Sequence, residues 1–277
     1  MTVHNSEAID MLTEMGCSRI VLARELGQKE ITDICSKKGN TEIEGFIHGA
    51  LCVCYSGRCL MSSIIGQRSG NRGRCAQPCR MEYSLLKDDK TLKSGYLLSP
   101  KDISTAEILD KVLATGVDSL KIEGRMKSPE YVYQVVSTYR KYVDEVMENG
   151  TLTIDKEDIS NLTQIFNRGG SSSHGYYDTY SSLNMLSKSP KSSGVEIGVV
   201  TGYNPKNKRC SIKLSRPVTA GDGIEIWSKQ HTGTGVNQTA GVGSTISVVV
   251  DGYIQKGDRV FIHYFSLKFN RLNITAK

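Results

Sequence analysis

Long apolar runs are missing from this sequence, and no stretch approaches the ~20 consecutive apolar residues that a membrane-spanning helix needs. The amino terminus, MTVHNSEAIDMLTEMG, lacks the basic start, apolar centre and small-residue cleavage site of a secretory signal. Prolines are few, six in 277 residues, and no long biased tract is present, so global disorder is not expected. These absences predict a folded cytoplasmic protein without membrane association.

Acidic side chains are absent between Gly57 and Arg80, although this stretch contains five arginines. The whole chain is only mildly basic, with 35 basic and 29 acidic residues, and such a balance does not by itself indicate nucleic-acid binding. The local excess of positive charge is therefore more informative than the total. It lies in a segment, residues 52–80, that holds five of the chain's eight cysteines.

Strand-like and helix-like segments alternate through the first half of the chain. Residues 18–23 and 41–50 are expected strands with a helix between them, and residues 101–116 have a helical pattern. A long helix is expected from Pro129, with Ser128 as its N-cap. The alternation predicts a parallel sheet with helices packed outside it. Only about four β/α units are present, which would make half of a TIM-like barrel.

The pattern changes in the second half, and the fold class expected overall is α/β followed by all-β. Residues 1–150 are assigned to the carboxyl-terminal half of a TIM-like barrel, with a cysteine-rich insertion at 51–80. Residues 151–193 read as a helix and a serine-rich linker. Residues 194–277 hold short alternating strands divided by Gly, Asn and Asp turns, which predicts a small β-barrel domain. Within it, GTGVNQTAG, residues 233–241, is interpreted as β turns.

The spacing of the crowded cysteines limits their chemistry. Six residues separate Cys52 from Cys59, fifteen separate Cys59 from Cys75, and three separate Cys75 from Cys79, with Cys54 as an extra thiol. A structural zinc site usually has two tight pairs, so zinc is the second choice. Four thiolates can instead hold an iron–sulfur cluster, whose negative charge the nearby arginines and loop amides would offset. A third interpretation is that these cysteines are small buried apolar residues.

One cysteine could also act as a nucleophile, as in a cysteine peptidase. His48 lies four residues before Cys52 and would be its base, and the arginines would lower the pKa of the thiol. Proximity along the sequence is poor evidence for that geometry, so this interpretation ranks below a metal or cluster site.

Several segments resemble a known family. EGFIHGALCVCYSGRCLMS, residues 44–62, is similar to the signature of the collagenase-like U32 peptidase family. NRGRCAQPCR, SLKIEGRMKSPEYV and TVHN also look like family segments. The resemblance is strong over about residues 1–170 and looser over the β-rich tail.

The resemblance implies a function beyond the family's name. Several members are regarded as factors that hydroxylate tRNA wobble uridine, ribosomal RNA or a quinone precursor without oxygen, with a cysteine-bound [4Fe-4S] cluster and prephenate linked to the reaction. The family's cluster ligands correspond here to Cys52, Cys59, Cys75 and Cys79, the first two more firmly than the last two. The sequence is most similar to the tRNA-hydroxylating branch, with tRNA or another RNA and a prephenate-like small carboxylate as expected partners. Peptidase activity and a non-catalytic role in binding RNA or a partner protein are the alternatives.

One feature departs from the family. Members begin with a strand-and-helix half, whereas MTVHN matches an internal family position. The expectation is that the first half of the barrel is absent or comes from a second family subunit, and that this polypeptide is inactive alone.

Further candidate residues follow expected strands, because the active site of a barrel gathers at the carboxyl ends of its strands. Glu123 and His48 are predicted to be catalytic, as acid–base groups. Cationic neighbours would suit a small dicarboxylate or an RNA phosphate, and salt bridges on a solvated rim are the alternative. The predicted substrate-binding residues are Arg24, Glu25, Lys121, Arg125, Arg72 and Arg74.

Three other residues are weaker candidates. Asn167 and Arg168, in the sequence FNRGG, are site candidates, with helix C-capping as the alternative. Trp227 could stack on RNA bases, although an aromatic residue in a strand more often belongs to a core.

Overall fold

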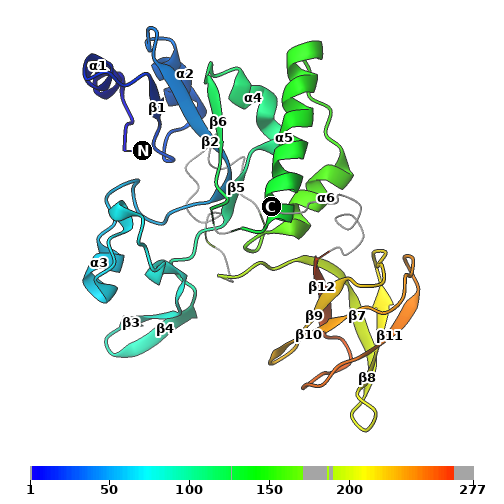
Figure 1. Cartoon of the computed structure of the whole chain (residues 1–277). Helices are drawn as coiled ribbons and strands as arrows, with labels where there is room; N and C mark the ends of the chain where they lie inside the picture. The colour runs from blue at the N-terminus through cyan, green and yellow to red at the C-terminus, as the bar shows by residue number, and fades with distance from the viewer. Residues whose placement is uncertain (1, 126, 171–185, 187–189, 265–277) are drawn as a thin grey trace. The chain divides into compact units, whose positions relative to one another are not determined.

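The chain forms two compact units in a computed structural model that describes residues 2–125, 127–170, 186 and 190–264 (Figure 1). The first unit comprises Met1–Ile159 and Arg168–Lys191, and the second comprises Ser160–Asn167 and Ser192–Lys277. No helix in the described part of the chain is both long enough and apolar enough to cross a membrane.

A small sheet organises the first unit, with β2 (Glu42–Ala50) at its centre. Strands β1 and β6 run parallel to β2, so that Ile20 pairs with Ile43 and Lys121 pairs with Phe46. Strand β5 (Asp102–Ser104) is antiparallel to the last residues of β2. The prediction of a wholly parallel sheet, with residues 101–116 as one helix, is therefore wrong at β5. Buried Ile103 places this short segment in the sheet before the helical pattern begins.

The first unit also contains helices α1, α2, α4 and α5. The longest of them, α5 (Pro129–Asn149), begins at the proline that the sequence predicted. The Ser128 side chain accepts a hydrogen bond from the Tyr131 backbone N–H, and Pro129 occupies the first turn. Tyr139, which faces inward from α5, is buried beside the end of β2. This helix therefore brings aromatic side chains to the carboxyl end of the central strand.

An excursion between β2 and β5 carries the crowded cysteines. It contains short helix α3 and a hairpin, β3–β4, which the sequence pattern did not reveal because its strands are mostly exposed. The turn of the hairpin places Asp88 and Asp89 at φ 50° and 58°, a conformation that Asp tolerates better than most residues.

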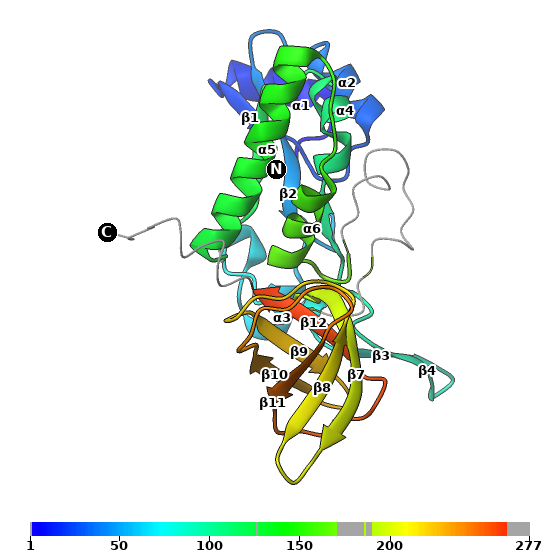
Figure 2. The ribbon, with the colours of Figure 1, turned by 90° about the vertical axis from the view of Figure 1, so that its right-hand side faces the viewer.

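The second unit is a curled antiparallel sheet with strand order β10-β9-β12-β7-β8-β11 (Figure 2). Its inward side chains, such as Ile212, Ile226 and Val260, form a core that is almost fully buried. The edge strands approach each other, because Thr234 Oγ1 donates to the Val249 carbonyl over 2.8 Å, but no ladder joins them within the described residues. The sheet is therefore a half-barrel. Residues 233–235 belong to β10, which corrects their interpretation as turns.

The remaining bounds in the first unit are α1 (Ser6–Glu14), β1 (Arg19–Val21), α2 (Gln28–Cys35), α3 (Met61–Gly66), β3 (Tyr83–Lys87), β4 (Lys90–Gly95), α4 (Leu109–Leu113) and β6 (Ser119–Ile122). Three 3-10 turns are Gly70–Arg72, Pro78–Arg80 and Ala106–Ile108, and α6 (Lys156–Ile165) contributes residues to both units. The second unit contains β7 (Val195–Asn204), β8 (Arg209–Leu214), β9 (Gly223–Trp227), β10 (His231–Gly235), β11 (Thr245–Val249) and β12 (Arg259–Tyr264).

Candidate functional site

The carboxyl ends of β1, β2 and β6 bring several predicted residues together. Gly49 has φ +119°, and a side chain there would lie 2.6 Å from the Glu123 carbonyl oxygen. Only glycine allows this close approach between the end of β2 and the segment after β6. The Glu123 backbone N–H accordingly donates to the His48 carbonyl over 2.8 Å.

Arg24 and Glu123 form an ion pair at this end of the sheet. Arg24 Nη2 lies 2.8 Å from Glu123 Oε1, and its guanidinium carbon lies 3.8 Å from the centre of the Phe46 ring. The side chains are 14% and 32% exposed, so the pair is partly shielded from water. Arg24 Nε–H is buried and makes no hydrogen bond within the described residues. Arg24 thus keeps one hydrogen-bond donor without a partner among the described residues, although its charge is paired.

Lys121 is likewise neutralised by a carboxylate. Its Nζ lies 2.9 Å from Glu44 Oε1, and Ser119 Oγ donates to the same carboxylate over 3.1 Å. Burial alone would raise the pKa of Glu44, but the hydrogen bonds from Lys121 and Ser119 outweigh it and leave that pKa lowered. Arg24 and Lys121 were both predicted to bind substrate. In the structure each of them forms an ion pair with a carboxylate of this chain.

Glu25 and Arg125 form hydrogen bonds that connect the cysteine segment, residues 52–80, to the carboxyl ends of the strands. Glu25 Oε1 accepts hydrogen bonds from the Ser56 backbone N–H over 2.8 Å and from Ser56 Oγ over 3.1 Å. Arg125 Nη2 donates to the Gly73 carbonyl over 3.2 Å. These contacts give both residues a positioning role for residues 52–80.

His48 is a buried neutral imidazole. Tyr139 Oη donates its proton to the Ile47 carbonyl over 3.0 Å and accepts from the Thr105 backbone N–H over 2.9 Å, so His48 Nδ1, 3.2 Å away, acts as a donor to it. Burial, and then the charge of Lys127, lowers the pKa of His48 to about 3. At neutral pH the ring therefore presents Nε2 as an acceptor and carries no charge.

Cys79 lies within electrostatic range of the other three predicted ligand cysteines. Burial raises the pKa of Cys79, the Arg80 charge opposes this, and neighbouring thiolates at Cys52, Cys75 and Cys59 raise it further. No group of three His, Cys, Asp or Glu side chains among the described residues is close enough to hold a metal ion as it stands. The donor set, four thiols in one segment with the half-buried Arg80 guanidinium beside Cys79, fits an iron–sulfur cluster in its chemistry.

Cys54 also lies near this group. Burial raises the pKa of its thiol, and the thiolates of Cys59 and Cys52 raise it further. A hydrogen bond with Cys59 adds to the same effect. The raised pKa values of Cys54 and Cys79 are the opposite of what a cysteine nucleophile requires.

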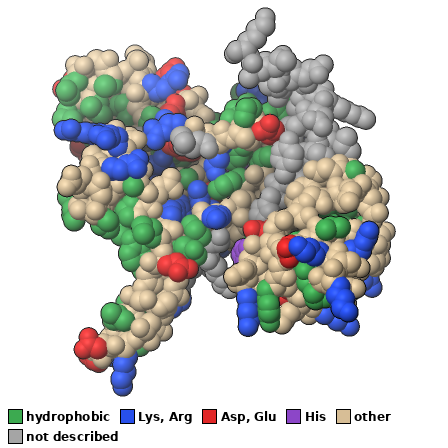
Figure 3. Space-filling view, turned by 60° about the horizontal axis from the view of Figure 1, so that its bottom comes forward, with side chains coloured by type: hydrophobic (Ala, Val, Ile, Leu, Met, Phe, Trp, Pro, Cys, Tyr) green, Lys and Arg blue, Asp and Glu red, His purple; other side chains and the backbone are tan. Residues whose placement is uncertain are grey.

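Arg72 and Arg74 lie on the surface of the cysteine segment, and both are exposed. The Arg74 carbonyl accepts from Arg68 Nε over 3.1 Å, which holds the loop. In Figure 3, Lys and Arg side chains gather on the part of the molecule from which the β3–β4 hairpin projects. These two arginines are therefore accessible to a polyanion.

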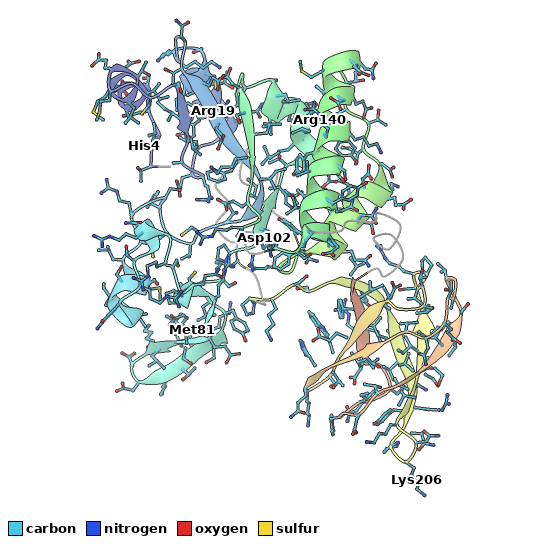
Figure 4. The ribbon with its side chains drawn as sticks, viewed as in Figure 1. His4, Arg19, Met81, Asp102, Arg140 and Lys206 are labelled. Carbon is cyan, nitrogen blue, oxygen red and sulfur yellow. The ribbon has the colours of Figure 1, made fainter. Side chains whose placement is uncertain are left out.

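Four charged residues that the sequence did not single out as a group meet near the end of β5, where Figure 4 labels Asp102. Asp102 and Arg168 form a buried ion pair, so Arg168 is not a helix cap. Arg80 donates to Ser99 Oγ over 2.7 Å, to the Leu51 carbonyl over 3.0 Å and to the Pro100 carbonyl. Lys127 is the fourth charged residue of this group, because its ammonium interacts electrostatically with Arg168, Asp102 and Arg80. No local motif could have found them, because they come from four separate segments.

Two weaker candidates lie in the second unit. Asn167 Nδ2 donates to the Thr163 carbonyl over 2.6 Å, as a residue that caps the end of α6 would. Trp227 is half-buried and stacks on His231, with ring centres 4.7 Å apart, and on Phe261, with ring centres 4.1 Å apart. Trp227 lies outside the hydrophobic core and forms part of an aromatic row across β10, β9 and β12.

Comparison with known proteins gives the family. Residues 1–186 match the model of peptidase family U32, and the chain belongs to that family. This confirms the resemblance inferred from the cysteine signature.

Three curated relatives carry two kinds of name. The chain is 34% identical over 244 residues to tRNA hydroxylation protein P1 of Bacillus subtilis, covering 83% of this chain and 56% of the relative. It is 34% identical over 239 residues to the 23S rRNA 5-hydroxycytidine C2501 synthase of Escherichia coli, covering 83% and 36%. It is 37% identical over 187 residues to a collagenase of Porphyromonas gingivalis, covering 61% and 44%. The chain thus spans about half the length of the curated relatives it matches.

Proposed function

We propose that this chain takes part in the hydroxylation of RNA, with a tRNA uridine as the target. The likeness to a tRNA hydroxylation protein and to an rRNA hydroxycytidine synthase supports this reaction class. The observation in the structure that carries the proposal is the electrostatic proximity of Cys79 to Cys52, Cys59 and Cys75, in a segment that Glu25 and Arg125 connect to the strand ends.

The proposed cofactor is a [4Fe-4S] cluster held by Cys52, Cys59, Cys75 and Cys79. All four lie in the segment between β2 and β5, and Arg80 supplies a half-buried positive charge next to Cys79. When bound, such a cluster would supply electron transfer. Zinc is the alternative occupant, and the wide spacing of the first pair disfavours it.

The chain's own residues would position the substrate. Neutral His48 presents Nε2 as a hydrogen-bond acceptor, and Tyr139 fixes its orientation. Arg24 Nε–H, buried and without a hydrogen-bond partner among the described residues, is a donor for an incoming oxygen atom. Exposed Arg72 and Arg74 would contact RNA phosphates, as basic side chains commonly do.

Replacement of a ring C–H bond by C–OH is a two-electron oxidation, so other molecules must reach the site. We propose that a small carboxylate related to prephenate is one of them. We also propose that β1, β2 and β6 belong to a larger (β/α) barrel whose other strands come from a second family subunit. The outer edge of β6 has no partner strand among the described residues, which supports such an arrangement.

Nucleoside analysis tests this function. The chain would be expressed together with a family subunit that supplies the other strands, in a bacterial strain that lacks its own tRNA hydroxylation proteins, and digested tRNA would be examined by mass spectrometry for hydroxyuridine. We expect hydroxyuridine with the wild type and with the remote control Cys17→Ser, and none with Cys52→Ser or Cys59→Ser. Full hydroxylation with Cys52→Ser would refute the proposal.

Peptidase activity is the second candidate, because a relative is named collagenase. Among the described residues no hydrogen bond joins a cysteine to His48, whose imidazole is oriented by Tyr139 instead. Gelatin cleavage by the full chain, abolished by a single cysteine substitution but insensitive to iron chelation, would favour the peptidase over RNA hydroxylation.

A further inference from the structure

The outer face of the second unit carries a line of side chains that crosses five neighbouring strands. His231 on β10 pairs with Trp227 on β9, and Trp227 pairs with Arg259 on β12. Arg259 pairs with Val199 on β7, which pairs in turn with Lys213 on β8. Directly paired residues point to the same face of a sheet, and none of these five belongs to the hydrophobic core. The line therefore lies on the solvent side.

The aromatic row occupies one end of this line. The Trp227 ring centre lies 4.7 Å from that of His231, with 13° between the ring planes, and 4.1 Å from that of Phe261, with 28° between them. Phe261 is 7% exposed, whereas the His231 side chain is 51% exposed. Trp227 Nε1–H donates to Glu225 Oε2 over 2.8 Å, which orients the indole. The row is thus accessible to a further flat ring at its His231 end.

Positive charge distinguishes the second unit from the first. Residues 192–277 contain 11 basic and 5 acidic side chains, and the other residues of the unit, 160–167, contain none of either kind. The formal net charge of the whole chain is +6, so all of the excess belongs to the second unit. Two of its cations, Arg209 and Lys213, are exposed on the outer side of β8. The unit therefore suits a polyanion that also carries flat rings.

Two carboxylates share this face without cancelling its charge. Glu196 forms an ion pair with Arg259, and Glu225 Oε2 lies 3.7 Å from His231 Nδ1. The side chains of the Arg259–Glu196 pair are 62% and 34% exposed, and an exposed pair of this kind contributes little free energy. A phosphate can therefore compete with Glu196 for the guanidinium. Lys213 lies next to Arg259 along the line, beyond Val199.

We propose that this face binds single-stranded RNA, with a base stacked at the His231 end of the aromatic row and phosphates at Arg259 and Lys213. Neighbouring strands lie ~4.8 Å apart, so the four steps from His231 to Lys213 cover ~19 Å, enough for a few nucleotides. A single strand exposes the faces of its bases, whereas a duplex hides them between neighbouring base pairs. The choice of RNA rests on the proposed hydroxylation, and the site adds an RNA contact outside the cysteine segment.

Tryptophan fluorescence of the full chain tests the site, because Trp227 is the only tryptophan in the sequence. An oligouridylate of ~12 nucleotides is titrated into the protein, within the range of site sizes that OB folds cover. Inorganic polyphosphate and a duplex RNA of equal length are the comparison probes. We expect a saturable change in emission with oligouridylate, with weaker binding at higher salt, and little change with the other two probes. RNA bound elsewhere on the chain does not give this signal.

Side-chain variants separate stacking from charge. His231→Ala should weaken oligouridylate binding about fivefold or more, the loss expected for one base–aromatic contact, and His231→Phe should restore it. Because His231 is exposed, neither change removes a core side chain. Lys213→Met should lower the slope of log affinity against log salt concentration by ~0.7. The control Lys29→Met, an exposed position of α2 in the first unit, should behave like the wild type.

Three results would overturn the site. Emission that does not change at ~100 μM oligouridylate would make the aromatic row a surface for another partner, such as a protein. An equal response to polyphosphate would show binding by charge alone. Equal affinity of the wild type and His231→Ala would exclude stacking. These failures differ from failure of the proposed function, which is measured as hydroxyuridine in tRNA and depends on Cys52 and Cys59.

Discussion

At the scale of single residues, the strand-end site is built from paired charges. Arg24 is neutralised by Glu123 and Lys121 by Glu44, whereas Glu25 and Arg125 bind backbone or hydroxyl groups of the cysteine segment. Function at this scale therefore depends on the orientation of a few atoms, such as Arg24 Nε and His48 Nε2. The total positive charge at the strand ends matters less for function than the orientation of these atoms.

The Arg24–Glu123 pair gives a first prediction. Because both groups are partly buried, a double-mutant cycle with Arg24→Met and Glu123→Gln should give a coupling free energy of about 1–2 kcal/mol in urea unfolding. The exposed Arg140–Asp144 pair is the control and should give less than about 0.5 kcal/mol. Equal coupling in the two pairs would contradict the assigned burial.

His48 gives a second prediction, on pH dependence. Its pKa is about 3 in the folded chain against an ordinary 6.5, so the unfolded state binds the extra proton and stability falls as the pH drops below about 6.5. The unfolding free energy of the wild type, relative to His48→Gln, should fall by about 2 kcal/mol between pH 7 and pH 5. Urea unfolding at both values measures this, and a pH-independent difference would show that His48 protonates freely when folded.

At the scale of elements, the sequence predicts strands and helices well where their patterns are local. Strands β1, β2 and β6 and helix α5 follow from alternating or helical apolar residues and from the Ser128–Pro129 start. Strand β10 was missed because its sequence, HTGTG, holds no apolar residue, although its main chain pairs fully with β9. The β3–β4 hairpin was missed for a related reason, since its apolar side chains are exposed.

The contrast between local patterns, which the sequence reveals, and contacts between distant segments, which it does not, also applies to the candidate site. The cysteines are close in sequence, so their grouping was predictable from spacing alone. The Arg80, Asp102, Lys127 and Arg168 cluster depends on the meeting of four distant segments, which no periodic pattern encodes. The neutral state of His48 also needed the structure, because the burial of the imidazole lowers its pKa.

The start of α5 gives a third prediction. Ser128→Ala removes the side-chain acceptor for the Tyr131 backbone N–H and should lower the free energy of unfolding by about 1 kcal/mol. The control Ser137→Ala, inside the same helix, should leave stability unchanged or slightly raised, since alanine favours helix interiors. Thermal or urea unfolding followed by circular dichroism compares them. A larger loss from Ser137→Ala would contradict the capping assignment.

At the scale of the whole molecule, the two units have separate hydrophobic cores. The second unit buries Ile212, Ile226, Ile246 and Val260 between its own strands. Half-buried Trp227 and exposed His231, which stack on each other, are available for contacts that the core does not need. Stacking of RNA bases on these rings would suit the proposed substrate.

This separation gives a fourth prediction. A fragment of residues 156–277 should fold alone and unfold cooperatively, because its core needs no side chain from the first unit. Circular dichroism and dispersed amide resonances in nuclear magnetic resonance would show this. A fragment that remains unfolded under native conditions would mean that the second unit depends on the first.

The claim on which the account depends is that four particular cysteines, and not the fifth, hold an iron–sulfur cluster. Iron and sulfide analysis of anaerobically reconstituted full chain tests it most directly. We expect ~4 iron and ~4 sulfide per chain for the wild type and for Cys54→Ser, and loss of most of the iron in Cys52→Ser, Cys59→Ser, Cys75→Ser and Cys79→Ser. Stoichiometric zinc in place of iron, or iron content equally sensitive to Cys54→Ser, would contradict it.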